Sequence, residues 1–216
     1  QLYPTALLVF PVRAFSYQEK PMNRTDIRIS LPSKGRLGTE STSFLAASGL
    51  EVKQVNPRQY TAGIPTLPNL MVLFQRVGDI VVSVRDGSVD FGITGLDILM
   101  ERQGDGDKVL ILHDNLRFGG CQLCVAVPEA WSDVHAAADL VTHAQSSPHP
   151  IRVATKFPRL TAEYLSNLGI SFTLVEAEGT LEVAPAIGFA DIIVDLVSSG
   201  QTLRYNRLRK LDDGVI

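Results

Sequence analysis

Short apolar runs with strand character alternate with helical stretches through most of this chain. Residues 27–31 alternate apolar and polar side chains as a strand does, and residues 39–48 have helical character and end at Gly49. The same order recurs where the strand-like residues 151–155 precede the helical residues 159–168. Repeated strand–turn–helix order favours an α/β fold with largely parallel sheets.

The remaining elements follow the same pattern. Further strands are expected at 51–55, 70–76, 89–94, 109–112, 121–127, 171–175 and 192–196, and further helices at 95–102 and 136–144. Residues 79–85 fit either a helix or a strand. The 216 residues suit one large domain or two smaller lobes. The loop at 114–120 is the candidate junction between lobes.

Two Gly-containing turns lie close together near the C-terminal end. One opens an apolar run, and the other follows the strand expected at 192–196. Such turns expose backbone N–H groups, Ser and Thr add donors, and Gly allows close approach of an oxygen. Together with an acid, they suit a sugar phosphate, although Asp195 and Thr202 could instead be local caps of an ordinary turn. The candidate binding residues are Glu178, Gly179, Thr180, Asp195, Ser198, Ser199, Gly200, Gln201 and Thr202.

Three cations and one further acid are candidates for the same kind of ligand. Lys34 and Arg36 follow the first strand, at the sheet edge where α/β proteins bind ligands. Arg58 lies in a Pro-flanked loop, and a guanidinium suits bidentate contacts with phosphate. Asp97 is the acid at the end of a strand–turn–acid pattern, which by itself is weak evidence for a binding site. Solvated surface charge is the ordinary interpretation of each residue taken alone.

Composition excludes several classes of protein. A net charge of −3 argues against broad nucleic-acid binding, and no apolar run approaches the roughly 20 residues that span a bilayer. Cys121 and Cys124 would point to opposite faces of a strand, which favours buried thiols over a redox or metal pair. The histidines lack metal-ligand spacing, and the P-loop, dinucleotide and nucleophile-elbow motifs are missing.

Several motifs of the chain resemble the catalytic part of the ATP phosphoribosyltransferase family, from about residue 27 to residue 216. The resemblance is carried by residues 31–37, 89–97, 118–121, 151–156, 178–185 and 193–203. Residues 53–60 are similar to the plant-type version of the family. That similarity favours a transit-peptide remnant over a disordered or cloning remnant for residues 1–25, and a plastid stroma location over a cytoplasmic one. Ser199 and Tyr205 depart from the residues that many family members have there.

The resemblance implies two α/β lobes similar to type II periplasmic binding proteins, with the active site in the cleft between them. Lobe I is expected to comprise 26–115 and 196–216, and lobe II 116–195. The implied reaction transfers 5-phosphoribosyl from phosphoribosyl pyrophosphate to N1 of ATP with release of pyrophosphate, the first step of histidine biosynthesis. The rival interpretations are a two-lobe solute-binding protein and a catalytically silent regulatory relative.

The resemblance also implies roles for the candidate residues. The 195–202 turn would hold the 5-phosphate and ribose, residues 178–180 would line the same pocket, and Arg36 and Arg58 would act near the phosphates. Mg²⁺ is expected as cofactor, held mainly by substrate phosphates and not by a protein metal site. The expected partners are the two substrates, without nucleic acid or membrane, in a homo-oligomer. The resemblance leaves open a regulatory domain or subunit outside this chain.

Overall fold

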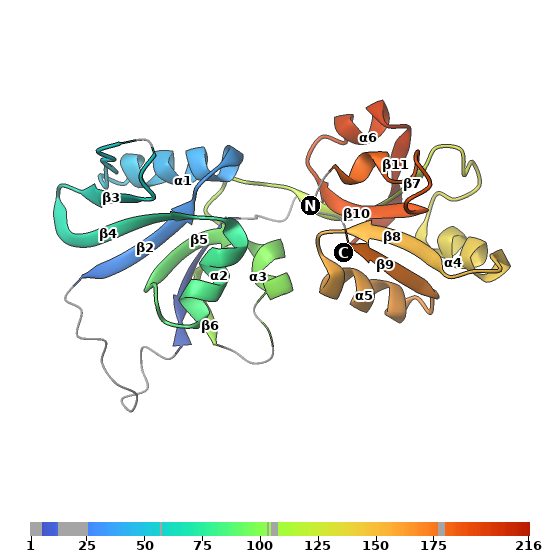
Figure 1. Cartoon of the computed structure of the whole chain (residues 1–216), viewed down its shortest axis with the longest axis horizontal. Coiled ribbons are helices and arrows are strands. Elements are labelled where there is room, and N and C mark those ends of the chain that lie inside the picture. Colours follow the sequence, from blue (N-terminus) through green and yellow to red (C-terminus); the bar gives the residue numbers. More distant parts are fainter. Residues whose placement is uncertain (1–5, 13–25, 57, 103, 105–107, 177–179) are drawn as a thin grey trace. The chain divides into compact units, whose positions relative to one another are not determined.

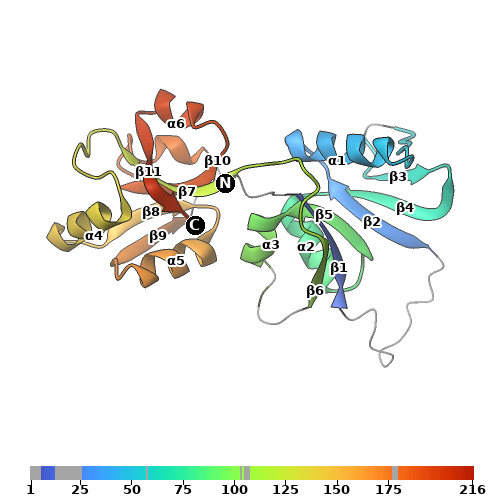
Figure 2. The same ribbon diagram turned by 180° about the vertical axis from the view of Figure 1, so that it is seen from behind.

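The structure, a computed structural model, describes residues 6–12, 26–56, 58–102, 104, 108–176 and 180–216. The chain forms two compact units (Figures 1 and 2), of which the first ends at Gly120 and the second begins at Cys121. Each unit has its own sheet, flanked by helices. This confirms the expected α/β class with two lobes.

Unit 1 contains a six-stranded sheet in the order β3-β4-β2-β5-β1-β6. Its strands are β1 (Ala6–Pro11), β2 (Ile27–Pro32), β3 (Thr61–Ile64), β4 (Leu67–Gln75), β5 (Phe91–Gly95) and β6 (Val109–His113). Strand β2 runs parallel to β4 and to β5, whereas β1 is antiparallel to both of its neighbours. The carboxyl ends of β2, β4 and β5 therefore lie at one edge of the sheet.

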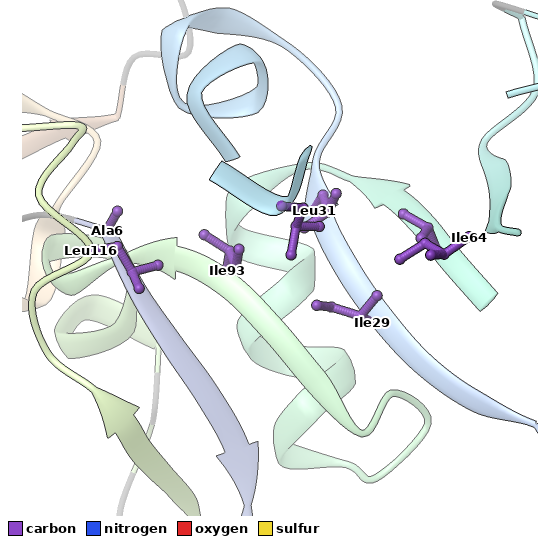
Figure 3. Packing of buried hydrophobic residues seen from close by; sticks show 8 residues of the cluster. Ala6, Ile29, Leu31, Ile64, Ile93 and Leu116 are labelled. Atoms are coloured by element: carbon purple, nitrogen blue, oxygen red, sulfur yellow. The ribbon is translucent and has the colours of Figure 1, made fainter. Parts of the chain in front are cut away.

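Helices cover both faces of this sheet. They are α1 (Gly35–Ala47), α2 (Val77–Arg85) and α3 (Leu96–Arg102). Leu45 of α1 belongs to one core cluster with Leu31 and Ile93 of the sheet (Figure 3). The other face packs Ile80 of α2 and Leu99 of α3 against β1. The two clusters lie on opposite faces because successive strand side chains alternate.

Unit 2 contains a five-stranded sheet in the order β11-β7-β10-β8-β9. Its elements are β7 (Gln122–Pro128), α4 (Ala137–Ser146), β8 (Ile151–Thr155), α5 (Pro158–Asn167), β9 (Phe172–Glu176), the 3-10 turn η2 (Leu181–Val183), β10 (Ile192–Val197), α6 (Gln201–Tyr205) and β11 (Leu208–Val215). Strands β10, β8 and β9 are parallel, so their carboxyl ends share an edge. Strand β7 is antiparallel to β10 and to β11.

The structure resolves one ambiguous element of the sequence analysis and corrects another. The ambiguous residues 79–85 are helical, because Ile80, Val81 and Val84 recur at helical spacing and are all buried. Residues 51–55 form no strand, and only Lys53 makes an isolated bridge, to Gly63. The strand beside β4 is instead β3, where the alternation is weak because Gly63 interrupts it.

The N-terminal segment differs from the expected leader. Within residues 1–25, Ala6–Pro11 forms β1, which fills the position between β5 and β6. Leu7 and Val9 are 1% and 0% exposed, so this short apolar run contributes to the core of unit 1. Residues 1–5 and 13–25 lie outside the described part of the chain.

The C-terminal segment also differs from the expected division into lobes. Residues 196–216 were assigned to lobe I, but they lie in unit 2. The reason is strand pairing, since β11 is hydrogen-bonded to β7 with Arg209 opposite Val127.

In the described residues, no helix is long and apolar enough to cross a membrane.

Candidate functional site

The turn after β10 combines a glycine of unusual backbone conformation with exposed polar side chains. Gly200 has φ = 68°, in the left-handed region, and immediately precedes α6. The Gln201 N–H lies 3.4 Å from Ser199 Oγ, which accepts a hydrogen bond from it. Ser198, Ser199, Gln201 and Thr202 are exposed. The turn therefore offers small hydroxyl-bearing residues around a glycine that adopts a conformation other residues avoid.

Asp195 lies on β10, three residues before this turn. Its Oδ1 accepts a hydrogen bond of 2.8 Å from the Leu196 N–H. Burial raises the pKa of the Asp195 carboxyl above its ordinary value, and that hydrogen bond and the charge of Lys156 oppose the rise. Glu182 acts in the same direction as burial. The carboxylate thus lies near one cation and one anion at the carboxyl edge of the unit 2 sheet.

The earlier turn is described only in part. Glu178 and Gly179 lie outside the described residues, so their predicted role has no structural test. Thr180 is exposed and precedes η2 without a side-chain cap. It follows β9, whose carboxyl end shares an edge with that of β10 through β8. Thr180 and the 195–202 turn therefore follow strands that end at the same edge of one sheet, with β8 between them.

Lys34 lies at the corresponding edge of unit 1. It borders two neighbouring pockets of about 470 and 260 Å³, which both also contact Pro32, Tyr60 and Phe74. Helix α1 lies close to the end of β2 at Gly38, where an added Cβ would lie only 2.5 Å from the Pro32 carbonyl oxygen. Lys34 is exposed, so its ammonium is accessible to a ligand in these pockets.

Arg36 lies one residue into α1 and contacts a distant segment of the same unit. Its Nη2 donates to the Gly120 carbonyl at 3.0 Å, and its Nε lies 3.8 Å from Glu40 Oε2. The same Glu40 oxygen accepts a 3.1 Å hydrogen bond from the Gly119 N–H. More than half of the Arg36 side chain remains exposed, at 57%.

Arg58 is held through its backbone. Its N–H donates to Asn56 Oδ1 at 2.9 Å, and the Gln54 amide donates to the Gln59 carbonyl in the same loop. Arg58 itself is exposed, and no side-chain partner occurs for it among the described residues. Because Gln59 and Tyr60 border the smaller pocket beside Lys34, the loop carries Arg58 to that part of unit 1.

Asp97 lies in the first turn of α3, directly after β5. Burial raises the pKa of its carboxyl, and hydrogen bonds from the Ile98 and Asp97 backbone oppose the rise. Strand β5 is parallel to β2, so Asp97 and Lys34 follow strand ends at the same sheet edge. No pocket described above includes Asp97 in its lining.

Three residues at these edges were not expected from sequence. Arg76 follows β4 and borders the 470 Å³ pocket with Lys34. Lys156 follows β8 and lowers the pKa of Asp195 through its charge. Glu40 contacts Arg36 and Gly119. Arg76 and Lys156 could have been found by asking which cations follow strands, whereas no local pattern indicates Glu40.

The described residues contain no group of three or more His, Cys, Asp or Glu side chains that could hold a metal ion. Cys124 is fully buried, and burial raises the pKa of its thiol. A buried neutral thiol of this kind behaves as a small apolar side chain.

The fold and these sites define a two-unit α/β protein with cations at the strand ends of unit 1 and a donor-rich turn at those of unit 2. The family model described as ATP phosphoribosyltransferase (HisG) matches residues 76–216. The chain belongs to the ATP phosphoribosyltransferase family.

Relatives from plants and bacteria agree with this membership. Chloroplastic ATP phosphoribosyltransferase 1 of Arabidopsis thaliana is 43% identical over 199 residues, which are 90% of this chain and 48% of that protein. The ATP phosphoribosyltransferase of Chelativorans sp. (strain BNC1) is 41% identical over 88% of this chain and 86% of its own length. The chain thus spans about half the length of the plant relatives.

A solved structure shares the fold. A chain in the ATP phosphoribosyl transferase (HisG:HisZ) complex from Thermotoga maritima superposes with a TM-score of 0.69 at 24% identity. The match covers 88% of this chain and 82% of that one. It supports the α/β architecture of the two units.

Proposed function

We propose that the full-length protein transfers the 5-phosphoribosyl group from phosphoribosyl pyrophosphate to N1 of ATP, releasing pyrophosphate. The observation that carries this proposal is the turn around Gly200, in a chain that belongs to the ATP phosphoribosyltransferase family. The turn combines positive φ, exposed hydroxyl groups and a nearby carboxylate. These features suit a 5-phosphate joined to a ribose that carries free hydroxyl groups.

In this proposal, unit 2 binds the phosphoribosyl group. The N–H groups and hydroxyls of residues 198–202 donate to the 5-phosphate, and Thr180 borders the same site together with Glu178 and Gly179. Asp195 accepts hydrogen bonds from the ribose hydroxyls. Its partial burial makes such bonds stronger than they would be in bulk water.

The cations of unit 1 act on the phosphates. Transfer breaks the bond between the ribose carbon and pyrophosphate and forms a bond to adenine N1, so negative charge builds on the leaving pyrophosphate. Arg36 and Arg58 stabilise that charge, and Lys34 binds a substrate phosphate beside it. The nucleophile belongs to ATP, so the protein contributes mainly positioning and charge stabilisation. The role of Asp97 is to bind substrate at the same sheet edge.

Mg²⁺ is proposed as the cofactor because it favours phosphate oxygens with one or two carboxylates. The substrate phosphates would supply most of its ligands, and no protein metal site is proposed for it. When bound, the ion neutralises charge on pyrophosphate.

The relatives support a proposal for the cellular location. Two plant relatives are chloroplastic, so we propose a plastid stroma location for this protein if it comes from a plant, and a cytoplasmic one otherwise. A homo-oligomer is proposed, and a further domain or subunit remains open, since a structural relative is a HisG:HisZ complex. The solute-binding alternative is not favoured by family membership.

Pyrophosphate release from the full-length protein tests the proposed function. The protein should release pyrophosphate only when ATP, phosphoribosyl pyrophosphate and Mg²⁺ are all present. A protein that binds both substrates by calorimetry but releases no pyrophosphate would overturn the proposal.

A further inference from the structure

Glu40 connects Arg36 to a segment almost eighty residues later in the chain. One oxygen, Oε2, accepts the Gly119 N–H at 3.1 Å and lies 3.8 Å from Arg36 Nε. Arg36 Nη2 donates to the neighbouring Gly120 carbonyl at 3.0 Å. The guanidinium is therefore contacted on its Nε and Nη2 side by one carboxylate and one backbone carbonyl. Among the described residues, Nη1 has no hydrogen-bond partner.

Residues 116–120, to which Glu40 is hydrogen-bonded, are also held in place by contacts that do not involve Glu40. Leu116 is only 8% exposed and belongs to the core cluster of unit 1. Phe118 packs against Phe44 of α1 with ring centroids 5.8 Å apart. Gly119 has φ = 73°, which fits a glycine and defines the direction of its N–H. Glu40 thus bonds to a backbone group whose position does not depend on Glu40 alone.

Orientation matters for an exposed arginine. The Arg36 side chain is 57% exposed, and a free Arg side chain loses rotamer entropy when a ligand fixes it. A carboxylate fixed by backbone reduces that loss because it restricts the guanidinium before the ligand arrives. Because Glu40 and the Gly120 carbonyl contact Nε and Nη2, Nη1 stays available to donate a hydrogen bond to a phosphate oxygen.

We propose that Glu40 is a positioning residue that orients Arg36 toward a substrate phosphate. The proposal rests on the proposed function, which assigns Arg36 to the phosphates of the reacting substrates. Glu40 itself touches no substrate. Its effect on the reaction should therefore pass through Arg36 and disappear when the guanidinium is removed.

A double-mutant cycle in the full-length protein measures this dependence. Glu40→Ala and Glu40→Gln are each combined with Arg36→Ala, and kcat/KM for phosphoribosyl pyrophosphate is measured for every variant. With Arg36 present, Glu40→Ala should lower kcat/KM about tenfold, and with Arg36→Ala it should lower it less than about twofold. Glu40→Gln can still accept the Gly119 N–H but loses its charge, so it should show a smaller loss that again depends on Arg36.

Glu163→Ala is the matched control. Glu163 pairs with Arg159 at i,i+4 on α5, at 3.4 Å, and neither residue lines the pockets beside Lys34 in unit 1. Its removal should leave kcat/KM unchanged. If Glu40→Ala is harmless, or costs the same with and without Arg36, Glu40 is only a structural anchor and the positioning role is wrong.

Binding of inorganic pyrophosphate provides a readout that needs no catalysis. Calorimetry across the same cycle should show that Glu40→Ala weakens pyrophosphate binding about tenfold only when Arg36 is present. Absence of turnover by the wild type would refute the proposed function, and the pyrophosphate titration would still decide the role of Glu40. Equal affinities throughout the cycle would overturn the positioning role.

Discussion

Gly200 is the residue whose conformation supports ligand binding most directly. Its φ of 68° lies where a β-branched side chain is strained. Gly200→Val should therefore weaken phosphoribosyl pyrophosphate binding by at least roughly 2 kcal/mol, because one or two charge-assisted hydrogen bonds are lost. Calorimetry on the full-length variant measures this loss.

Gly169→Val controls for backbone strain. Gly169 has φ = 70° after α5, with open space around its Cα. Gly169→Val should lose about as much folding stability as Gly200→Val but keep its affinity for phosphoribosyl pyrophosphate. If Gly200→Val binds like the wild type, the turn is structural and the phosphate assignment is wrong.

Arg58 tests whether the unit 1 loop acts on the reaction. Arg58→Ala should lower kcat by about 10²-fold or more with a smaller change in KM, because leaving-group charge is greatest in the transition state. Lys should restore only part of the activity, since it lacks the guanidinium fork. Single-turnover kinetics isolates the chemical step, with the exposed Arg159→Ala as control. An unchanged chemical step in Arg58→Ala would make Arg58 an ordinary surface residue.

Asp195 links binding to stability through its pKa. Burial raises the folded-state pKa above the unfolded value, so the native state holds the proton more tightly. Stability is then lost as pH rises from the unfolded pKa of about 3.9 through the folded pKa, and at neutral pH the carboxylate opposes folding.

Asp195→Asn should raise the melting temperature at pH 7 and remove this pH dependence, while weakening phosphoribosyl pyrophosphate binding about tenfold or more. Thermal unfolding at pH 4 and pH 7, with calorimetry, measures both effects. A variant that is less stable than the wild type at pH 7 would contradict the dominance of burial.

Local sequence patterns predict some of these site residues but not others. The turn around Gly200 could be recognised because two serines and a glycine follow a strand-like run, a pattern typical of a turn with exposed donors. Glu40 could not, since its role depends on Gly119, which only the folded chain brings to it. Arg58 was recognised as a cation in a loop, and its action on phosphate stays a prediction.

At the scale of elements, strand β1 changes how the N-terminal region is understood. Leu7 is 1% exposed and packs with α2 and α3. Leu7→Ala should lower the free energy of unfolding by roughly 2–4 kcal/mol, because it removes buried methyl groups and leaves a cavity. Leu112→Ala on β6, where the side chain is 50% exposed, should cost less than about 0.5 kcal/mol. Chemical denaturation compares the two, and equal small losses would mean that β1 is dispensable.

The elements that sequence predicts well are those with strong local periodicity. Helix α5 and strand β8 match the expected ranges within about a residue, because their apolar spacing is regular. Strand β1 was not expected, since the prolines near it suggest irregular chain. Strand β11 was missed because Arg209, Lys210, Asp212 and Asp213 hide its alternation. Pairing with β7 stabilises it nonetheless.

At the scale of the whole molecule, the sequence predicts two lobes and the loop that joins them, but not the lobe to which the C-terminal residues belong. The loop before Cys121 was recognised as a junction, and the first unit does end at Gly120. The assignment of residues 196–216 could not be inferred locally, because it depends on hydrogen bonds between β11 and β7, about eighty residues apart. The expected position of the active site between the lobes stays a prediction.

The central claim is that phosphoribosyl is transferred to N1 of ATP, and product structure tests it most directly. The full-length protein is incubated with ¹⁵N-labelled ATP, phosphoribosyl pyrophosphate and Mg²⁺, and the product is analysed by mass spectrometry and NMR. The account predicts an ATP adduct one phosphoribosyl group heavier, with the ribose carbon bonded to labelled N1. Unmodified ATP beside ribose 5-phosphate, or attachment at another atom, would contradict it.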